Sequence, residues 1–445
     1  MKRKVVSFII MAGLIATMAG GCGTTGSSES DETSNEKKEE AANEEETTSE
    51  GEQIISFWKS SDATDGWYEE KIEEFNEQNA GKYKVEMEVV ASSGTFSYDD
   101  KVSAAVTSNT LPDIMMVDGP YVSTYAENEL IIPIEQYIAA EDKEDLMPGA
   151  LQQNTYDGQL YAYSITESSV ALYYNIDMLE AAGIKMRTPE APEDALTWEE
   201  FEEIACALTK DDVVGTNIIL DKGEGMIYAL LPFYVSAGTN LISEDGTQAT
   251  GYFNNEAAYE ATEFLNNLIQ NGYANVDPID NEFANQKAAT MISGSYQLAN
   301  AESWDFNWGV TYYPIKETGA EAASPNGDWV FTITSSSDKP EAAAGFISFI
   351  CSKENCAENA KVNSKIPARS SVMEESEEWE KYPNSIFREE LLKTSHARPS
   401  TPVYATLTSE FSNGLFDIFS GADIQETLDN AAAAIDKEYE TVYGK

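Results

Sequence analysis

Apolar and polar positions along the chain predict strands that alternate with helices. An apolar run at 54–58 predicts a short buried strand, and 67–79 has apolar residues at helical spacing. Residues 85–89 alternate as in a strand with one buried face, a helix follows near 98–108, and 114–117 is again an apolar strand. This β-α-β-α-β order predicts a mostly parallel sheet with helices on both of its faces.

The same pattern continues toward the C-terminus. Asp157-Gly158 predicts a turn between two strands. Thr197, followed three residues later by an acid, predicts a helix that begins with a capping box. Further helices are predicted at 256–270 and from Pro340 to about residue 352.

The N-terminus is of a different kind. Three basic residues precede the apolar stretch 5–21, which is short and interrupted, so it predicts a secretory signal rather than a spanning helix. Its end, Ala19-Gly20-Gly21-Cys22, resembles the bacterial lipoprotein signal, in which the cysteine is lipidated. We expect a signal peptide over 1–21 and lipid on Cys22. An ordinary cleaved signal with an incidental cysteine is the alternative.

The segment 22–52 has no helical or strand period. From Gly23 to Glu50 it holds ten acids and two lysines, and it is otherwise built mainly from small and polar residues. Such a stretch buries too little apolar surface to offset its chain entropy, so we expect a disordered acidic linker between a membrane anchor and a folded body.

Charge and histidine content exclude several functions. The chain has 28 basic and 78 acidic residues, a net charge of −50. This argues against a nucleic-acid partner and against lying on an anionic membrane surface. The single histidine, His396, argues against a His-based hydrolase or a His-ligated metal, and we expect no metal and no cofactor. Cys206, Cys351 and Cys356 are expected to be free thiols, buried or half-buried, with a Cys351–Cys356 disulfide as the less favoured alternative.

The body resembles the extracellular solute-binding proteins of bacterial ABC importers, in particular the sugar-binding family that includes maltose-binding protein. Thr197-Trp198-Glu199-Glu200-Phe201, for example, resembles the family's TWDEF segment, and the matching segments follow one another in the family's order over nearly the whole body. These segments are 75–79, 111–114, 156–162, 171–178, 197–201, 283–291, 327–329 and 365–369.

The resemblance implies a type II periplasmic-binding-protein-like α/β fold, in which two lobes close on a ligand by a hinge motion. Lobe one is expected at 53–163 plus 311–365, and lobe two at 164–310 plus 366–445. The implied function is that of a lipid-anchored monomer on the extracellular face of the cell membrane. It would capture a sugar or oligosaccharide and deliver it to a permease with a separate ATPase, without catalysis.

Aromatic rings that stack on sugar C–H faces, and polar groups that bind hydroxyls, give the candidate ligand-binding residues. Asp118 follows a strand, where an α/β sheet places its site. Trp58, Lys59, Glu167 and Tyr296 stand where the family has cleft residues. The complete set is Trp58, Lys59, Asp118, Tyr121, Glu167, Tyr228, Tyr234, Tyr296, Trp304, Trp329 and Arg369.

Structural roles compete with each assignment. Core packing would explain Trp58 and both tyrosines of the helix near 228–234, a helix cap would explain Asp118, and a solvated loop charge would explain Glu167. Arg369 is expected to hold a hinge by a salt bridge more than to touch the ligand. Two other functions stay open: binding of a peptide, polyamine or other cationic solute, which the acids and rings would also suit, and, less favoured, glycoside hydrolysis.

Overall fold

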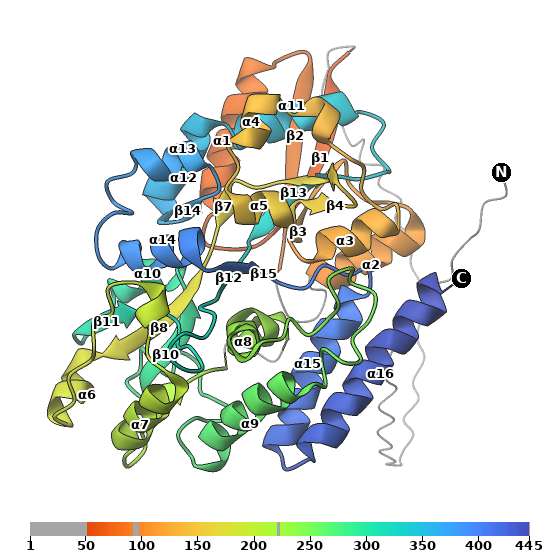
Figure 1. Ribbon diagram of the computed structural model, residues 1–445. Coiled ribbons are helices and arrows are strands. Elements are labelled where there is room, and N and C mark those ends of the chain that lie inside the picture. Colours follow the sequence, from red (N-terminus) through yellow and green to blue (C-terminus); the bar gives the residue numbers. More distant parts are fainter. Residues whose placement is uncertain (1–50, 92–97, 220–222, 445) are drawn as a thin grey trace, which may run out of the picture. The chain divides into compact units, whose positions relative to one another are not determined.

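Figure 1 shows the computed structural model of the chain, which describes residues 51–91, 98–219 and 223–444. These residues belong to one unit, Ser49–Lys445. The predictions for the signal peptide, for Cys22 and for nearly all of the linker lie outside the described residues. Within those residues, no helix is long and apolar enough to cross a membrane.

Strands and helices follow one another along the chain. The strands are β1 (Gln53–Ser60), β2 (Tyr83–Val90), β3 (Ile114–Asp118), β4 (Thr155–Tyr156), β5 (Gln159–Leu160), β6 (Ala162–Tyr163), β7 (Thr166–Glu167), β8 (Val170–Asn175), β9 (Val214–Asn217), β10 (Ala288–Gly294), β11 (Trp308–Thr311), β12 (Ser324–Asn326), β13 (Trp329–Ile333), β14 (Ile366–Pro367) and β15 (Ser395–Ala397). The α-helices are α1 (Asp65–Gln78), α2 (Tyr98–Ser108), α3 (Tyr121–Glu127), α4 (Ala140–Glu144), α5 (Pro148–Gln153), α6 (Ile176–Ala181), α7 (Trp198–Leu208), α8 (Glu224–Ala237), α9 (Glu256–Gln270), α10 (Gln297–Ala301), α11 (Pro340–Ile350), α12 (Lys353–Asn363), α13 (Ser370–Glu375), α14 (Asn384–Lys393), α15 (Tyr404–Phe419) and α16 (Ile424–Tyr443). Two short 3-10 helices lie at Glu135–Tyr137 and Pro192–Asp194.

The first sheet has the strand order β2-β1-β3-β13-β6. β1 pairs in parallel with β2 and β3, as the sequence predicts. β13, however, pairs antiparallel with both β3 and β6, so the prediction of a mostly parallel sheet is wrong for the β3-β13-β6 part of this sheet. The reason is that β13 returns to the sheet from a distant part of the chain, and no single β-α-β crossover sets its direction.

Successive side chains of the first sheet point to opposite faces, and helices cover both. On one face, the centre of the Phe57 ring lies 5.6 Å from the centre of the Phe331 ring and 5.7 Å from that of Phe346 on α11. On the other face, Val117 is buried in a cluster that includes Tyr98 of α2 and Val122 of α3. The predicted covering of both faces is therefore confirmed.

The second sheet has the order β11-β8-β10-β9, with β8 antiparallel to both of its neighbours and β10 parallel to β9. Its core includes residues of α7, α8, α9, α15 and α16 (Figure 1). From Met226 to Ser236 every residue of α8 is buried. A helix that is apolar on all sides requires such enclosure.

Short strand pairs lie on the segments that connect the two sheets. β7, which lies between β6 of the first sheet and β8 of the second, pairs antiparallel with β14. β12, which precedes β13, pairs in parallel with β15. These two short strand pairs therefore lie at the junction between the first sheet and the second. The lobe boundaries drawn from the sequence stay a prediction.

Several local predictions are confirmed. The helices predicted at 98–108 and 256–270 are α2 and α9, and Thr197 and Glu200 form the capping box at the start of α7. Cys206, Cys351 and Cys356 are free thiols. Cys206 was expected to be at least half-buried but is exposed, because the buried face of α7 carries Phe201, Ala205 and Leu208 instead.

Glu390 on α14 generates a prediction about pH and stability. Its fully buried carboxyl accepts hydrogen bonds from the Tyr313 backbone N–H, at 2.6 Å, and from the Thr394 hydroxyl. Burial raises the pKa of Glu390 to about 8, so the folded chain holds this proton through a range in which the unfolded chain has released it. The stabilising contribution is therefore complete below about pH 4.5 and is lost as the pH rises to about 8.

Glu390→Gln keeps the shape of the protonated acid and should remove this pH dependence. Urea unfolding at pH 5 and at pH 8 should show that wild type loses stability relative to the variant by on the order of 3 kcal/mol across this interval. Glu180→Gln, an exposed position on α6, is the control and should show no such difference. Parallel stability curves for wild type and Glu390→Gln would contradict the prediction.

Candidate functional site

A cavity of about 600 Å³ opens where the two sheets and their connecting segments meet. Its size falls within the range of roughly 300–1,000 Å³ typical of small-molecule sites. Asp118 ends β3, Glu167 ends β7, and Tyr228 projects from the first half of α8. A smaller cavity of about 260 Å³ adjoins it, and Asp62, Asp328, Trp329 and Lys365 line both.

Arg398 is the central charge of the larger cavity. Its side chain is 3% exposed, and its two terminal nitrogens bind the Asp118 carboxylate at 2.7 and 2.8 Å. One of these nitrogens also binds Glu224 at 2.6 Å, and the guanidinium lies 5.2 Å from the centre of the Tyr228 ring. Arg398 therefore joins the end of β3, in the first sheet, to the start of α8, which packs in the core of the second.

Glu224 carries the second acid of this group. Its Oε1 also accepts a hydrogen bond from the Tyr404 hydroxyl, whereas its Oε2 is buried without a partner among the described residues. Burial raises the pKa of Glu224, although Arg398 acts in the opposite direction. One cation thus serves two carboxylates here.

Glu167 also lines the larger cavity and is almost completely buried. Its Oε2 accepts the Gly327 backbone N–H at 3.0 Å, and its Oε1 has no partner among the described residues. Burial, and then the nearby charge of Asp328, raise the pKa of Glu167 to about 8. At neutral pH this side chain is therefore a protonated acid that can donate a hydrogen bond.

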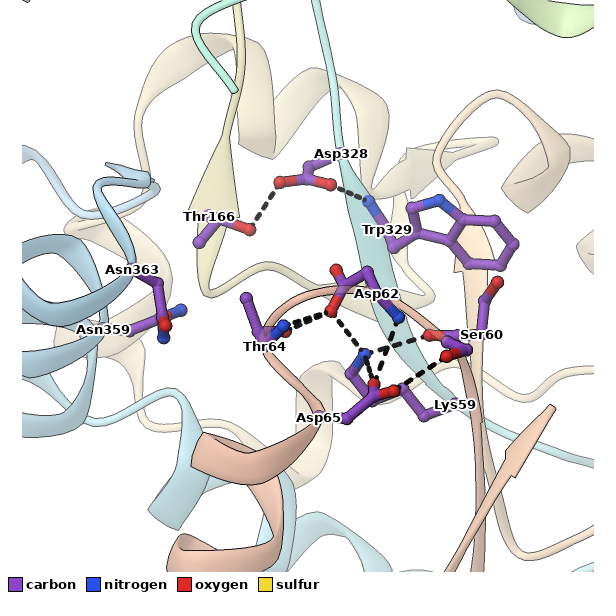
Figure 2. Close-up of polar contacts among 11 residues, drawn as sticks. Lys59, Ser60, Asp62, Thr64, Asp65, Thr166, Asp328, Trp329, Asn359 and Asn363 are labelled. Carbon is purple, nitrogen blue, oxygen red and sulfur yellow. Dashed lines mark hydrogen bonds and ion pairs between the residues drawn. The ribbon is translucent and has the colours of Figure 1, made fainter. Parts of the chain in front are cut away.

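The turn between β12 and β13 brings Asp328 and Trp329 to the cavity. Gly327 has a φ of +130°, a backbone conformation that residues with a side chain rarely adopt, so glycine is favoured at this position. The Asp328 carboxylate accepts hydrogen bonds from the Thr166 hydroxyl at 2.6 Å and from the Trp329 backbone N–H at 2.8 Å (Figure 2). The half-buried Trp329 ring meets Tyr98 edge-on, with ring centres 5.2 Å apart.

Lys59 holds the loop between β1 and α1 beside the smaller cavity. Its ammonium donates to the Ser60 carbonyl at 2.9 Å, Asp62 at 2.8 Å and Asp65 at 2.6 Å (Figure 2). Three acceptors match its three protons, so Lys59 is saturated within the protein. Burial alone would raise the pKa of Asp62, but hydrogen bonds from Lys59 and Thr64 lower it below its ordinary value.

The structure brings six of the predicted site residues together around the larger cavity: Asp118, Tyr121, Glu167, Tyr228, Tyr296 and Trp329. Lys59 lines only the smaller one. Sequence reasoning did not select several others that line the larger cavity, namely Asp62, Tyr98, Tyr125, Glu224, Asp328, Lys365 and Arg398. Asp62 and Asp328 could have been found, because both lie in short polar turns next to a strand.

The remaining predicted residues lie outside both cavities. Trp58 packs against the cluster that holds Tyr98 and Val117, and the Lys101 ammonium lies over its ring. Tyr234 is buried, and its hydroxyl lies 2.9 Å from the Thr262 hydroxyl. Trp304 stacks on Phe306 in an aromatic cluster. Arg369 binds Asp145 at 2.9 Å and also binds Asp142, which agrees with the salt-bridge role expected for it.

The larger cavity has the lining of a small-molecule site. No group of three or more His, Cys, Asp or Glu side chains suited to a metal ion occurs in the described part of the chain. The rings of Tyr121 and Tyr125 stack with their centres 6.1 Å apart. Tyr228, Tyr296 and Trp329 add further aromatic faces to the larger cavity, beside its carboxyl groups. Such a lining suits a small molecule that has both apolar faces and hydrogen-bonding groups.

Comparison with known proteins identifies the group to which this architecture belongs. The sequence pattern of the bacterial extracellular solute-binding proteins matches residues 70–387. The chain belongs to this family. The maltodextrin-binding protein of Bacillus subtilis is 23% identical over 390 residues, which cover 83% of this chain and 88% of that protein. A maltooligosaccharide ABC transporter solute-binding lipoprotein of Streptococcus pneumoniae is 22% identical over 362 residues, 76% of this chain and 79% of that one.

Solved solute-binding proteins share the two-lobed fold. A Thermotoga lettingae ABC transporter solute-binding protein, bound with α-D-tagatose, superposes with a TM-score of 0.75 at 22% identity, covering 87% of this chain and all of that one. The cyclic α-maltosyl-1,6-maltose binding protein of Arthrobacter globiformis gives 0.74 at 22% identity, covering 88% and 100%. The predicted fold class is therefore confirmed, and the relatives named here are binding proteins.

Removal of the Arg398 charge tests the central ion group. Arg398→Met leaves the partly buried carboxylates of Asp118 and Glu224 without their cation, and we expect it to lower the free energy of unfolding at pH 7 by about 3 kcal/mol. The loss should be smaller at pH 5, because burial already raises the pKa of Glu224, and without Arg398 this carboxyl takes up a proton more readily. Urea unfolding at both pH values measures this.

Lys287→Met, which breaks an exposed pair with Asp212, is the matched control and should leave the free energy of unfolding nearly unchanged. An equally small effect of Arg398→Met would show that the buried ion group contributes little.

Proposed function

We propose that this solute-binding protein captures a sugar or oligosaccharide in the larger cavity and delivers it to the permease of an ABC importer, which has a separate ATPase. The cavity itself carries the proposal. It combines tyrosine and tryptophan rings with acids and an arginine in a space of about 600 Å³. Aromatic rings suit the C–H faces of a sugar, and the carboxyl groups and guanidinium suit its hydroxyls.

The names of relatives support this choice of ligand. The proteins from Bacillus subtilis and Streptococcus pneumoniae are named for maltodextrin and maltooligosaccharide. The solved neighbours hold or are named for tagatose and a cyclic maltosyl-maltose. Because these ligands differ in size and linkage, they support a saccharide without choosing one.

Closure of two lobes is the proposed mechanism of capture. The lobes would be 53–163 plus 311–365 and 164–310 plus 366–445, with the connecting strands β7, β12, β14 and β15 as the hinge region. Contacts that the ligand makes only in the closed form would shift the population toward that form. Arg398, which binds Asp118 at the end of β3 and Glu224 at the start of α8, would hold these two elements together during this motion.

The protein is proposed to act as a monomer and to perform no chemistry on its ligand. Asp118 and Glu224 are both bound by Arg398, so neither is free to serve as the acid and base of a glycosidase. A sugar recovered unchanged after incubation with the protein is the expected result.

Sugar binding is tested with the chain from residue 22 onward, carrying Cys22→Ser. A thermal-shift screen with maltotriose, α-D-tagatose, a peptide mixture and spermidine should show stabilisation by a sugar, about 2.7 kcal/mol at a hundredfold excess over the dissociation constant. Trp329→Ala should then weaken binding of that sugar by about 1–3 kcal/mol in calorimetry.

Trp304→Phe changes a tryptophan outside the cavities and should leave the affinity unchanged. A shift with spermidine or peptides alone would overturn the choice of ligand. Unchanged affinity in folded Trp329→Ala would remove this ring from the site.

A lipid anchor on Cys22 and a location on the extracellular face of the cell membrane complete the proposal. Residues 1–22 support it through their likeness to a lipoprotein signal, and the relative from Streptococcus pneumoniae is named a lipoprotein. In a bacterial host, Cys22→Ser should move the full chain from the membrane fraction to the medium, followed by immunoblot. Retention of the variant in the membrane would contradict a lipid anchor, and retention of an equally expressed wild type is the control.

A further inference from the structure

The two cavities contain more negative than positive groups. Five carboxyl side chains line them, against the three cations Lys59, Lys365 and Arg398. Arg398 is shared by Asp118 and Glu224, and Lys59 is shared by Asp62 and Asp65, which lies just outside the lining. Each shared cation therefore leaves one negative charge without compensation.

The other two charged groups do not remove this excess. Asp328 is held by the Thr166 hydroxyl and the Trp329 N–H, not by a cation. Lys365, which lines both cavities, forms no ion pair within the described part of the chain and can offset one carboxylate. The excess therefore persists after Lys365 is counted, even with Glu167 neutral.

Two carboxyl oxygens in the wall of the larger cavity, Glu167 Oε1 and Glu224 Oε2, are buried and form no well-aligned hydrogen bond among the described residues. The Asn326 side chain near Glu167 and the Thr408 hydroxyl near Glu224 act only to lower the pKa of each carboxyl. Buried carboxyl oxygens without a well-formed hydrogen bond are rare in folded proteins, and a binding site is one place where they occur, because the ligand supplies the partner. Figure 2 shows, in addition, one Asp62 oxygen that no dashed line reaches, turned toward the side on which Asp328 and Thr166 lie.

A cation would satisfy both deficits, whereas a hydroxyl would satisfy only one. A hydroxyl donates a hydrogen bond but leaves the charge unbalanced, and an ammonium group supplies the donor and the charge together. The aromatic lining acts in the same direction, because ring faces attract cations. With a net charge of −50, the whole chain also attracts cationic solutes and repels anionic ones.

We infer that the saccharide bound in this cleft carries a protonated amine, as in a glucosamine-type sugar or an oligosaccharide of such units. This inference rests on the proposed function, since it specifies the class of sugar. The amine would lie near Glu167 and Glu224, and the ring C–H faces would lie on Trp329 and the tyrosines.

Proton release offers a signature that a neutral sugar would not give. Glu167 holds its proton at neutral pH, with a pKa of about 8. The other charged or titratable groups around the same cavity are Asp62, Tyr98, Asp118, Tyr121, Tyr125, Glu224, Tyr228, Tyr296, Asp328, Lys365 and Arg398. An ammonium beside Glu167 would lower its pKa and release up to about one proton per ligand at pH 7.

The experiment compares sugars that differ only at one substituent. Glucosamine, N-acetylglucosamine and glucose form one set, and their β-1,4-linked trimers form the second. Calorimetry with the chain from residue 22, carrying Cys22→Ser, is run at pH 7 in phosphate and in Tris, whose ionisation enthalpies differ. The amine-bearing member of at least one set should bind at least about tenfold more tightly than its neutral partners and release a proton.

Glu167→Gln and Glu390→Gln form a matched pair of variants, because both acids are buried and both have a pKa of about 8. Glu167→Gln should remove the proton release and reduce the amine preference by about tenfold. Glu390→Gln, which lies outside both cavities, should change neither. Thermal unfolding shows that each variant is folded.

Contrary results are distinguishable. Equal or tighter binding of neutral sugars, including maltotriose, overturns the amine and leaves the proposed function standing. Spermidine bound as tightly as the amine-bearing sugars, with every neutral sugar inactive, overturns the saccharide itself. Failure of every amine-bearing sugar to bind at millimolar concentration also contradicts the inference.

Discussion

A shortage of cations constrains this molecule more than any other feature. With 28 basic and 78 acidic residues, most carboxylates must remain without a cationic partner, and those in the interior must share. Lys59, Arg369 and Arg398, each at most 4% exposed in the side chain, bind two acids apiece. Loss of one such buried cation leaves two partly buried carboxylates without a partner, which is more costly than loss of a fully exposed pair.

Two of these shared cations, Arg369 and Arg398, lie where distant parts of the chain meet, and Lys59 holds a local loop. Arg398 follows β15 and joins β3 to α8, Arg369 follows β14 and binds the region around α4, and Lys59 ties the end of β1 to the start of α1. Arg398 and Lys59, which bind acids inside the protein, also contribute to the charge of the cavity walls.

The sequence predicts local elements well because the hydrophobic period is a local signal. The first three strands and helices α2 and α9 follow from it directly. The direction of β13 does not, because the strand that it pairs with lies far away in the sequence. The site shows the same division: Asp118 is found from its place after a predicted strand, and Glu167 from the resemblance to the family. Arg398 is missed because its partners are 280 and 174 residues distant.

Residue type alone also misleads. Tyr234 and Trp304 have the chemistry of sugar-stacking rings, yet they pack in the interior, since the same rings serve equally well as core. Which role a ring takes depends on which neighbours the fold brings to it, and a single sequence does not contain that information in a local pattern.

The position of β13 has a consequence for the order of folding. This strand, from residues 329–333, lies between β3 and β6, so the first sheet stays incomplete until that part of the chain is available. Contacts between such distant segments form slowly, because a large loop must close before they stabilise anything. During synthesis the N-terminal third therefore lacks an interior strand of its sheet and remains without a finished core. A chain in that condition can still be threaded through a translocation channel before it folds on the far side.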